Sequence, residues 1–298
     1  MNADLAAAIP SMGAQSRVAR PLPSRSEAGV ARVLALANQK GGVAKTTTVA
    51  SLGAALAELD QRVLVVDLDP QACLTFSLGL DPDALELSVH DVLLGRVPAA
   101  MVLQETDDGM TLLPAAIDLT GSEARLVTRG GREFVLREAL ADVGTAYDWV
   151  IVDCSPSLGV LTLNALTAAD AVVIPLQCET LSHRGVGQLL ETIDEVRKRT
   201  NPDLDVLGIL PTLYDGRTTH ARAVLTDVAV RYSVPVLEPP VPKSVRFAEA
   251  PAAGRTVLRT APSSAGAQAY REHARRLLAG ARAAGNGSGN GAVASGPL

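Results

Sequence analysis

Short apolar runs alternate with longer amphipathic runs along most of the chain. The apolar runs have the length of strands and lie at Val33–Ala37, Arg62–Asp67, Met110–Pro114, Trp149–Asp153, Ala171–Pro175, Val206–Leu210 and Val234–Leu237. The amphipathic runs predict helices at Thr46–Leu59, Arg132–Leu140, Leu163–Ala168, Gly185–Arg199, His220–Tyr232 and Ser264–Arg282. Continuous apolar strands between helices are typical of a parallel sheet covered on both faces. The pattern therefore predicts an α/β fold with a doubly wound, mostly parallel sheet.

The two ends of the chain do not share this pattern. Residues 1–30 mix Ala, Ser, Pro and Arg without a period, which predicts a flexible N-terminal arm. Its arginines, Arg17, Arg20 and Arg25, leave a contact with a partner or with DNA open. Residues 283–298 are rich in Gly, Asn and Ser and predict a disordered tail. No long linker interrupts residues 31–282, so we expect one domain there.

Composition narrows the class of protein. Of 298 residues, 47% are hydrophobic, which is enough for a sizeable core. No apolar run approaches the roughly 18–20 residues of a membrane span, and the N-terminus does not resemble a signal peptide. The cysteines Cys73, Cys154 and Cys178 lie far apart and form neither a metal-binding spacing nor a disulfide framework. These features favour a protein of the reducing cytoplasm.

Charge is unevenly distributed along the chain. The formal net charge is −5. The segment from Pro240 to Arg282 has eight basic and two acidic residues, so it carries +6 and the remainder −11. Such asymmetry indicates either a surface that binds polyanions or arginines that pair with acids elsewhere in the fold, and charge alone leaves both open.

A glycine-rich run between the first predicted strand and the first predicted helix resembles a phosphate-binding loop. Glycines allow backbone amides to surround anionic oxygens, the helix N-terminus adds partial positive charge, and Lys45 adds a full one. The hydroxyl of Thr46 could bind Mg²⁺. The pattern G-x-x-x-x-G-K-[ST] would need glycine where Gln39 and Ala44 stand, whereas K-G-G-x-x-K-[ST]-T matches in full. The predicted nucleotide-binding residues of this loop are Gly41, Gly42, Val43, Ala44, Lys45, Thr46 and Thr47. Because alanine disfavours a positive φ, we expect the loop not to need one at Ala44.

Aspartates follow two other predicted strands. In an open parallel sheet, ligands bind beyond the carboxyl ends of the strands. Asp153 ends an apolar strand, as does the carboxylate that orders Mg²⁺ in phosphate-loop enzymes. Asp69 could position an attacking water, and Asp67 could support the metal shell. Pro211 and Thr212, at the end of another strand, are candidates for the adenine side of the site, although they could equally be turn and packing residues.

The run Lys40–Thr47 resembles the deviant Walker A motif of the ParA/MinD family of P-loop ATPases. Further stretches resemble the ParA (Soj-like) partition branch, so that the resemblance covers roughly residues 32–280: Val65–Gln71, Trp149–Ala165, Val173–Glu179, Leu210–Arg217 and Pro242–Pro251. The resemblance implies that ATP and Mg²⁺ bind at the loop and that ATP is hydrolysed, with Lys45 contacting the phosphates. It also implies that Lys40 reaches the ATP of a second subunit in a homodimer. In that family Asp69 would position the water, and Asp153 and Thr46 would serve Mg²⁺.

The resemblance also implies partners. Dimers of this branch are expected to bind double-stranded DNA without sequence preference, in the bacterial nucleoid, and to be stimulated by a ParB-type centromere-binding protein. The candidate DNA-binding residues are Arg217, Lys243, Arg246 and Arg271. The resulting function would be chromosome or plasmid segregation.

Other functions share the loop. Related ATPases position protein cargo on the nucleoid, and the sequence does not separate these from DNA partition. A MinD-like membrane ATPase would need a C-terminal amphipathic helix, whereas this chain ends in a Gly/Asn/Ser tail, so no stable membrane association is expected. Iron-protein reductases need suitably placed cysteines, and a glutamine-using amidoligase would need a further catalytic domain for which we expect no room.

Overall fold

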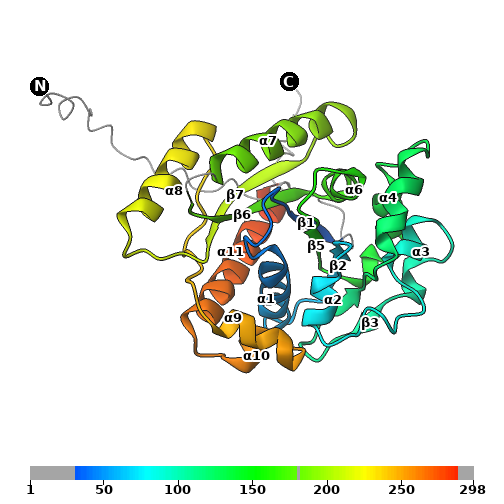
Figure 1. Ribbon diagram of the computed structural model, residues 1–298, viewed down its shortest axis with the longest axis horizontal. Helices are drawn as coiled ribbons and strands as arrows, with labels where there is room; N and C mark the ends of the chain where they lie inside the picture. Colours follow the sequence, from blue (N-terminus) through cyan, green and yellow to red (C-terminus); the bar gives the residue numbers. More distant parts are fainter. Residues whose placement is uncertain (1–30, 180–181, 288–298) are drawn as a thin grey trace, which may run out of the picture.

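The computed structural model describes residues 31–179 and 182–287. In these residues seven strands form one sheet in the order β3-β4-β2-β5-β1-β6-β7 (Figure 1). The strands are β1 (Arg32–Leu36), β2 (Val63–Leu68), β3 (Gln104–Glu105), β4 (Thr111–Leu113), β5 (Trp149–Cys154), β6 (Ala171–Gln177) and β7 (Asp205–Thr212). All pairs are parallel except β3 with β4. The prediction of a mostly parallel sheet is confirmed.

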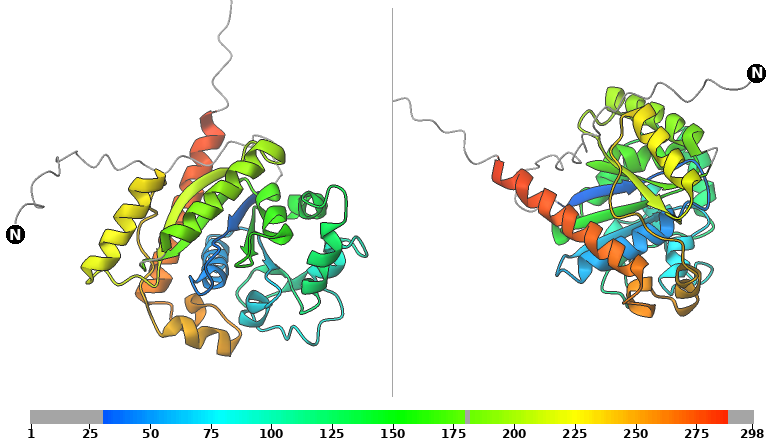
Figure 2. Two further views of the ribbon diagram at one scale, coloured as in Figure 1. Left: turned by 45° about the horizontal axis from the view of Figure 1, so that its top comes forward. Right: turned by 90° about the vertical axis from the view of Figure 1, so that its left-hand side faces the viewer.

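Helices cover both faces of this sheet (Figures 1 and 2). The longer helices are α1 (Lys45–Ala57), α4 (Leu119–Val127), α6 (Val160–Ala168), α7 (Ser182–Arg199), α8 (Thr219–Tyr232) and α11 (Ala265–Gly287). The shorter ones are α2 (Cys73–Ser77), α3 (Val89–Leu93), α5 (Val135–Ala141), α9 (Arg246–Glu249), α10 (Val257–Thr260), and the 3₁₀ turns η1 (Ala99–Met101), η2 (Gly144–Ala146) and η3 (Ala250–Ala253). None of the helices within the described ranges is both long enough and apolar enough to cross a bilayer.

Alternate residues of each strand enter two separate cores. In β1, Leu34 and Leu36 join the core under α1 and α11, whereas Ala35 joins the core under α3 to α8. Because side chains of a strand alternate between faces, a strand buried on both faces reads as one apolar run. This double burial is why the central strands could be recognised from sequence.

The edges of the fold depart from the sequence prediction. Val234–Leu237 is not a strand, since it makes only an isolated bridge from Val236 to Ile209. Strand β3 and the helices α2, α3, α9 and α10 were not predicted, because segments of two to five residues without a continuous apolar run have too little periodicity to stand out. The nine-residue helix α4 was not predicted either. The last helix continues to Gly287, beyond the expected end at Arg282. The predicted arm and residues 288–298 of the predicted tail lie outside the described residues.

Candidate nucleotide and magnesium site

The loop after β1 is fixed by Asn38 at the carboxyl edge of the sheet. The Asn38 side chain is buried, donates to the Pro175 carbonyl at 2.7 Å and accepts from the Lys40 amide at 2.9 Å. One amide side chain therefore ties the loop to β6 and sets its first turn. Sequence reasoning assigned Asn38 no role, because its partner lies 137 residues away.

The glycines leave open space inside the loop. A Cβ added to Gly41 or Gly42 would meet no atom within 4 Å, and Gly42 has a φ of +73°. The positive φ favours glycine, and the empty space allows a ligand to approach the backbone. The loop therefore has the open space that a phosphate cradle would need, and its role in binding phosphate stays a prediction.

Ala44 contradicts the expectation drawn from its side chain. It has φ 61° and ψ 35°, in the left-handed region, and directly precedes α1. Its carbonyl accepts from both the amide and the hydroxyl of Thr48, at 3.0 and 2.7 Å. The helix start therefore holds alanine in a conformation that an L-residue adopts at a cost.

Replacing Ala44 with glycine is expected to raise the free energy of unfolding by about 0.5–1 kcal/mol, because relief of the left-handed strain exceeds the added entropy of the unfolded chain. Urea unfolding followed by circular dichroism measures this change. The matched control Ala54→Gly, within α1, should lower stability by about 1 kcal/mol. A lower free energy of unfolding in Ala44→Gly would show that Ala44 is not strained in its left-handed conformation.

The two lysines of the loop lie in different environments. Lys45 is 7% exposed, and its Nζ lies 3.4 Å from the Lys40 carbonyl, inside the loop. The Lys40 side chain is 35% exposed at the rim and pairs with the carboxylate of Glu179, just after β6. Lys45 can therefore serve a phosphate within its own subunit, whereas Lys40 lies at the surface.

Asp153, at the end of β5, is a buried carboxylate without compensation. Neither of its oxygens has a hydrogen-bond partner in the described part of the chain. Burial raises its pKa well above the usual value, and the carboxylate of Asp67 raises it further. The Thr46 hydroxyl and the Lys45 ammonium oppose this rise in pKa, so both lie close to Asp153 although neither makes a normal hydrogen bond to it. Such a group is stabilised by a nearby cation.

Asp67 lies opposite Asp153 in the β2–β5 register but is satisfied by its own loop. It accepts from the amide and hydroxyl of Thr75, at 2.9 and 2.7 Å, and from the Asp69 amide at 3.1 Å. Burial raises its pKa to about 6, and the Thr75 hydrogen bonds act in the opposite direction. Asp67 therefore holds the loop that carries Asp69, and Asp153 is the better placed of the two for a metal.

Asp69 is half-buried at the mouth of the site, where its Oδ1 accepts from the Gln71 amide at 3.0 Å. Its second oxygen makes no hydrogen bond within the described residues and can accept one from water. The structure thus gathers Asp69, Asp153, Thr46 and Lys45 at one edge of the sheet, as the strand-end argument predicted.

Pro211 and Thr212, at the end of β7, lie beneath the loop. Both are buried, and the Thr212 hydroxyl donates to the Val43 carbonyl at 2.9 Å. In this structure Thr212 supports the phosphate loop, and its adenine-side role stays a prediction.

The donor set fits Mg²⁺ held together with phosphate oxygens. No cluster of three or more His, Cys, Asp or Glu side chains in residues 31–179 and 182–287 could hold a metal by itself. Mg²⁺ commonly keeps several waters and takes one or two protein oxygens plus phosphates, so a hydroxyl and an unpaired carboxylate suffice. Thr46 and Asp153 are the residues that would hold it.

Three of the four candidate DNA-binding residues lie together after β7. Arg217 pairs with Asp215 at 2.9 Å. The hydrogen bonds from Arg217 and, to a smaller extent, the charge of nearby Lys243 lower the pKa of Asp215 to about 2. Arg246 begins α9 three residues after Lys243 and pairs with Glu249. Arg271 does not join them, because it is held against Glu58 by hydrogen bonds of 2.6 and 2.9 Å and is only 18% exposed.

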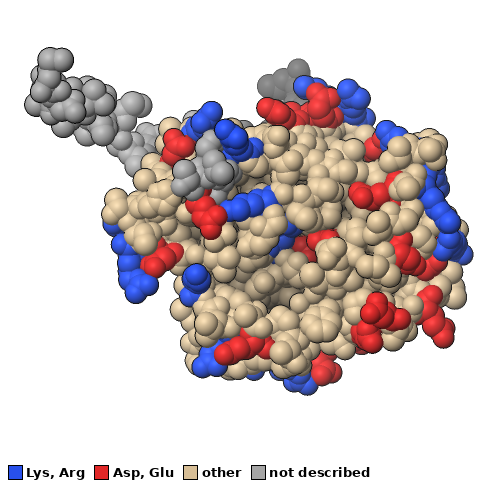
Figure 3. All heavy atoms as spheres, viewed as in Figure 1, with Lys and Arg blue, Asp and Glu red and all other residues tan. Residues whose placement is uncertain are grey.

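Much of the positive segment is neutralised by neighbouring acids. Arg255 and Arg259 pair with Asp107 and Asp108 of the β3–β4 connection, and Arg275 and Arg276 both pair with Glu272. Acidic and basic side chains are interspersed on the face seen in Figure 3. Arg255, Arg259 and Arg271 pair with acids outside the segment, so pairing with acids elsewhere in the fold accounts for about half of its charge of +6.

Comparisons with known proteins agree with this geometry. A family model described as an AAA domain matches residues 31–206. The chromosome partitioning protein ParA of Myxococcus xanthus is 42% identical over 85% of this chain and 90% of its own length. The chromosome-partitioning ATPase Soj of Thermus thermophilus is 47% identical over 83% of this chain and 96% of its own.

A solved structure is more similar in sequence but carries a different name. It is described as cobyrinic acid a,c-diamide synthase from Mycobacterium smegmatis with bound ADP and magnesium. Its TM-score is 0.76 at 62% identity, covering 83% of this chain and 94% of that chain. Because two partition proteins match over most of their lengths and the loop, strand-end aspartates and sheet order fit the same fold, the chain belongs to the ParA/Soj family of P-loop ATPases.

Proposed function

We propose that the protein is an ATP hydrolase that dimerises with ATP, binds DNA without sequence preference and acts in chromosome or plasmid segregation. The observation that carries the proposal is that the two lysines of the loop lie in different environments. Lys45 lies inside the loop and Lys40 lies at its exposed rim. A single subunit needs only Lys45 to bind its own nucleotide, whereas Lys40 could reach the nucleotide of a second subunit.

Residues of one subunit account for nucleotide binding. The amides around Gly41 and Gly42 and the ammonium of Lys45 would bind phosphate oxygens, since the glycines leave open space and the loop directly precedes the N-terminus of α1. The Thr46 hydroxyl and the Asp153 carboxylate hold the cation, which supplies charge neutralisation on the phosphates. Solved structures of similar proteins hold ADP or an ATP analogue with magnesium, which supports ATP and Mg²⁺ as the cofactors here.

Hydrolysis requires a water and a second positive charge. Asp69 orients the water through its free carboxylate oxygen, while Asp67 and Gln71 keep its loop in position. Lys40 of a second subunit adds charge where the transition state becomes more negative, as an arginine finger does. To do so it must leave Glu179, which holds it within its own subunit.

DNA binding would use the exposed basic residues after β7. Arg217, Lys243 and Arg246 lie near the same edge of the sheet as the nucleotide loop. Phosphate contacts suffice for binding without sequence preference, and a dimer doubles their number. Nucleotide-dependent dimerisation would thereby control DNA affinity. A ParB-type partner that stimulates hydrolysis would release the protein from DNA.

Replacing Arg246 with glutamate is expected to weaken ATP-dependent DNA binding roughly tenfold at low salt, because each subunit of the dimer loses a phosphate contact and gains a repulsive charge. Fluorescence anisotropy with a random-sequence duplex measures affinity, and nucleotide binding should be unchanged. The control Arg199→Glu breaks a comparable exposed pair, with Glu195, on α7. Equal DNA affinity in both variants would remove Arg246 from the interface, and an unmodified protein that ignores DNA would refute the DNA-binding function.

The printed name of the M. smegmatis structure favours a second candidate, amide transfer from glutamine. A glutamine-cleaving nucleophile would need a cysteine with a lowered pKa. Burial instead raises the pKa of Cys73, of Cys154 and, to about 11, of Cys178. The chemistry of the described cysteines therefore supports partition over amide transfer. Transport of a protein cargo on the nucleoid remains compatible with the same site, because a partner would select the cargo.

A further inference from the structure

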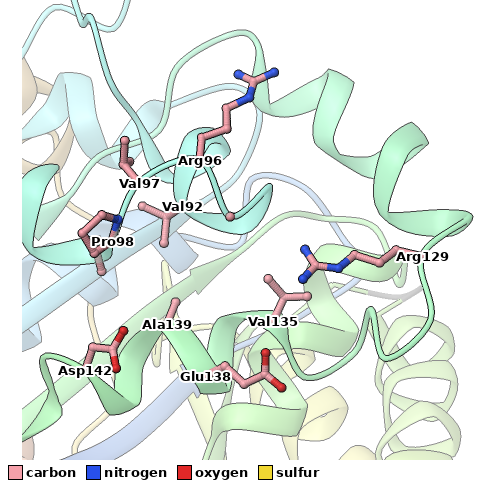
Figure 4. Close-up of a pocket in the computed structure, with 11 residues that line it drawn as sticks. Val92, Arg96, Val97, Pro98, Arg129, Val135, Glu138, Ala139 and Asp142 are labelled. Atoms are coloured by element: carbon pink, nitrogen blue, oxygen red, sulfur yellow. The ribbon is translucent and has the colours of Figure 1, made fainter.

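A groove outside the nucleotide site lies between α5 and the loop that follows α3. Its volume is about 410 Å³. One wall is a single face of α5 and its C-cap, made by Val135, Glu138, Ala139 and Asp142, whose spacing of three, four and seven residues puts them on one side of a helix. The other wall contains Val92, Val97 and Pro98 (Figure 4).

The groove combines a mixed polar and apolar lining with an acidic edge. Glu138 and Asp142 are exposed, and neither forms an ion pair with any residue the structure describes. The basic residues at its other end are engaged: Arg96 pairs with Asp91 at 2.8 Å, and Arg129 donates to the Leu93 carbonyl at 3.3 Å. The Leu93 carbonyl is neutral, so Arg129 keeps its positive charge, and with Glu138 and Asp142 at −1 each the groove has a net charge of −1. Its negative charge lies along α5.

The chain enters the fold at one end of this groove. The amide of Ala31, the first described residue, donates to the Gly144 carbonyl at 3.2 Å, and Gly144 is two residues beyond Asp142. Whatever precedes Ala31 therefore starts beside the acidic edge.

We propose that residues 16–26 of this chain dock into the groove. This segment contains three arginines and no acid, and Pro21-Leu22-Pro23 lies between Arg20 and Arg25. Prolines favour an extended polyproline conformation, so a proline-containing segment loses little conformational entropy on binding. Its apolar side chains can contact Val97 and Pro98, and the flanking arginines can pair with the carboxylates of Glu138 and Asp142.

Chain length and linkage favour this occupant over an independent partner. The eight residues from Pro23 to Ala31 can span roughly 25 Å, whereas the seven-residue α5 is roughly 10 Å long. A tethered segment has an effective concentration in the millimolar range, so contacts too weak for a separate protein suffice. DNA is excluded as an occupant by the negative edge.

Photo-crosslinking in the full chain tests the proposal. Benzoylphenylalanine replaces Leu22 in one protein and Leu5, also in the arm, in a control protein. Irradiation of a mixture of isotopically heavy and light chains, followed by mass spectrometry, should give crosslinks from position 22 to residues 92–99 or 135–142 within one chain. Equal crosslinking from position 5, crosslinks elsewhere, or no crosslinks would overturn the proposal. Heavy–light crosslinks would assign the groove to a second copy and overturn it as well.

A charge exchange tests the ionic part independently. Glu138→Arg with Asp142→Arg should lower the yield of the position-22 crosslink roughly fivefold, since an exposed ion pair contributes up to about that factor. Adding Arg20→Glu and Arg25→Glu should restore the yield. An unchanged yield in the first variant, or no restoration in the second, would contradict pairing between these groups. Both substituted positions on α5 are exposed, and thermal unfolding of each variant verifies the fold.

Discussion

Replacing Lys40 with alanine is expected to leave ATP binding by one subunit nearly unchanged and to abolish ATP-dependent dimerisation. Lys45 and the loop amides bind the phosphates within the subunit, and Lys40 lies outside their cradle at the rim. In a two-fold dimer the substitution removes two charged contacts at the interface. Each costs about 2–5 kcal/mol when truncated, so the dissociation constant of the dimer should rise roughly a thousandfold or more.

Sedimentation velocity with ATP and Mg²⁺ measures this loss, and titration with a fluorescent ATP analogue measures nucleotide affinity. The matched control is Glu179→Gln, which breaks the same ion pair within the subunit but keeps the lysine. This control should still dimerise, because Lys40 no longer has to leave a carboxylate. A normal dimer in Lys40→Ala would refute the role across the interface. Loss of dimerisation in both variants would instead make the Lys40–Glu179 contact a structural requirement.

The central strands and the loop could be predicted because their signals are local. Residues of β1 and β5 are buried on both faces, so each strand is a continuous apolar run that ends at the candidate site. The order of glycine, lysine and threonine in the loop likewise lies within one short segment. Sequence reasoning could therefore select Lys45, Thr46 and Asp153 as candidates without knowing how the strands are arranged.

Interactions between distant segments could not be predicted in this way. Glu179 lies 139 residues from Lys40. Thr75 satisfies Asp67, so among the described residues Asp153 is the strand-end aspartate whose buried carboxyl group lacks a hydrogen-bond partner. Ala44 adopts a positive φ because the loop and the start of α1 together impose it, against its own preference. The arginines near the C-terminus show the same limit, since Arg255 finds Asp107 only through the tertiary fold.

Replacing Asp69 with alanine is expected to lower the rate of ATP hydrolysis roughly 100-fold or more, which is the usual effect of losing a group that orients or deprotonates water. The proposed metal and phosphate contacts do not involve Asp69, so the proposed ATP-bound dimer should still form. Without hydrolysis it should remain on DNA for longer. A phosphate-release assay measures turnover, and the dissociation rate from an immobilised duplex measures retention.

Two further variants separate the charge of Asp69 from its part in the turn. Asp69→Asn keeps an oxygen that can accept from the Gln71 amide, so a similar loss of turnover in this variant would assign the effect to the carboxylate. Asp81 accepts from the Asp83 amide at 3.1 Å in the same kind of turn, yet it lies outside the site, so Asp81→Ala should hydrolyse ATP normally. Rapid turnover in Asp69→Ala would leave the water without an oriented partner in the proposed mechanism. That result would refute the assignment of Asp69, and Asp153 would not replace it, because its buried position suits a metal better than a water at the mouth of the loop.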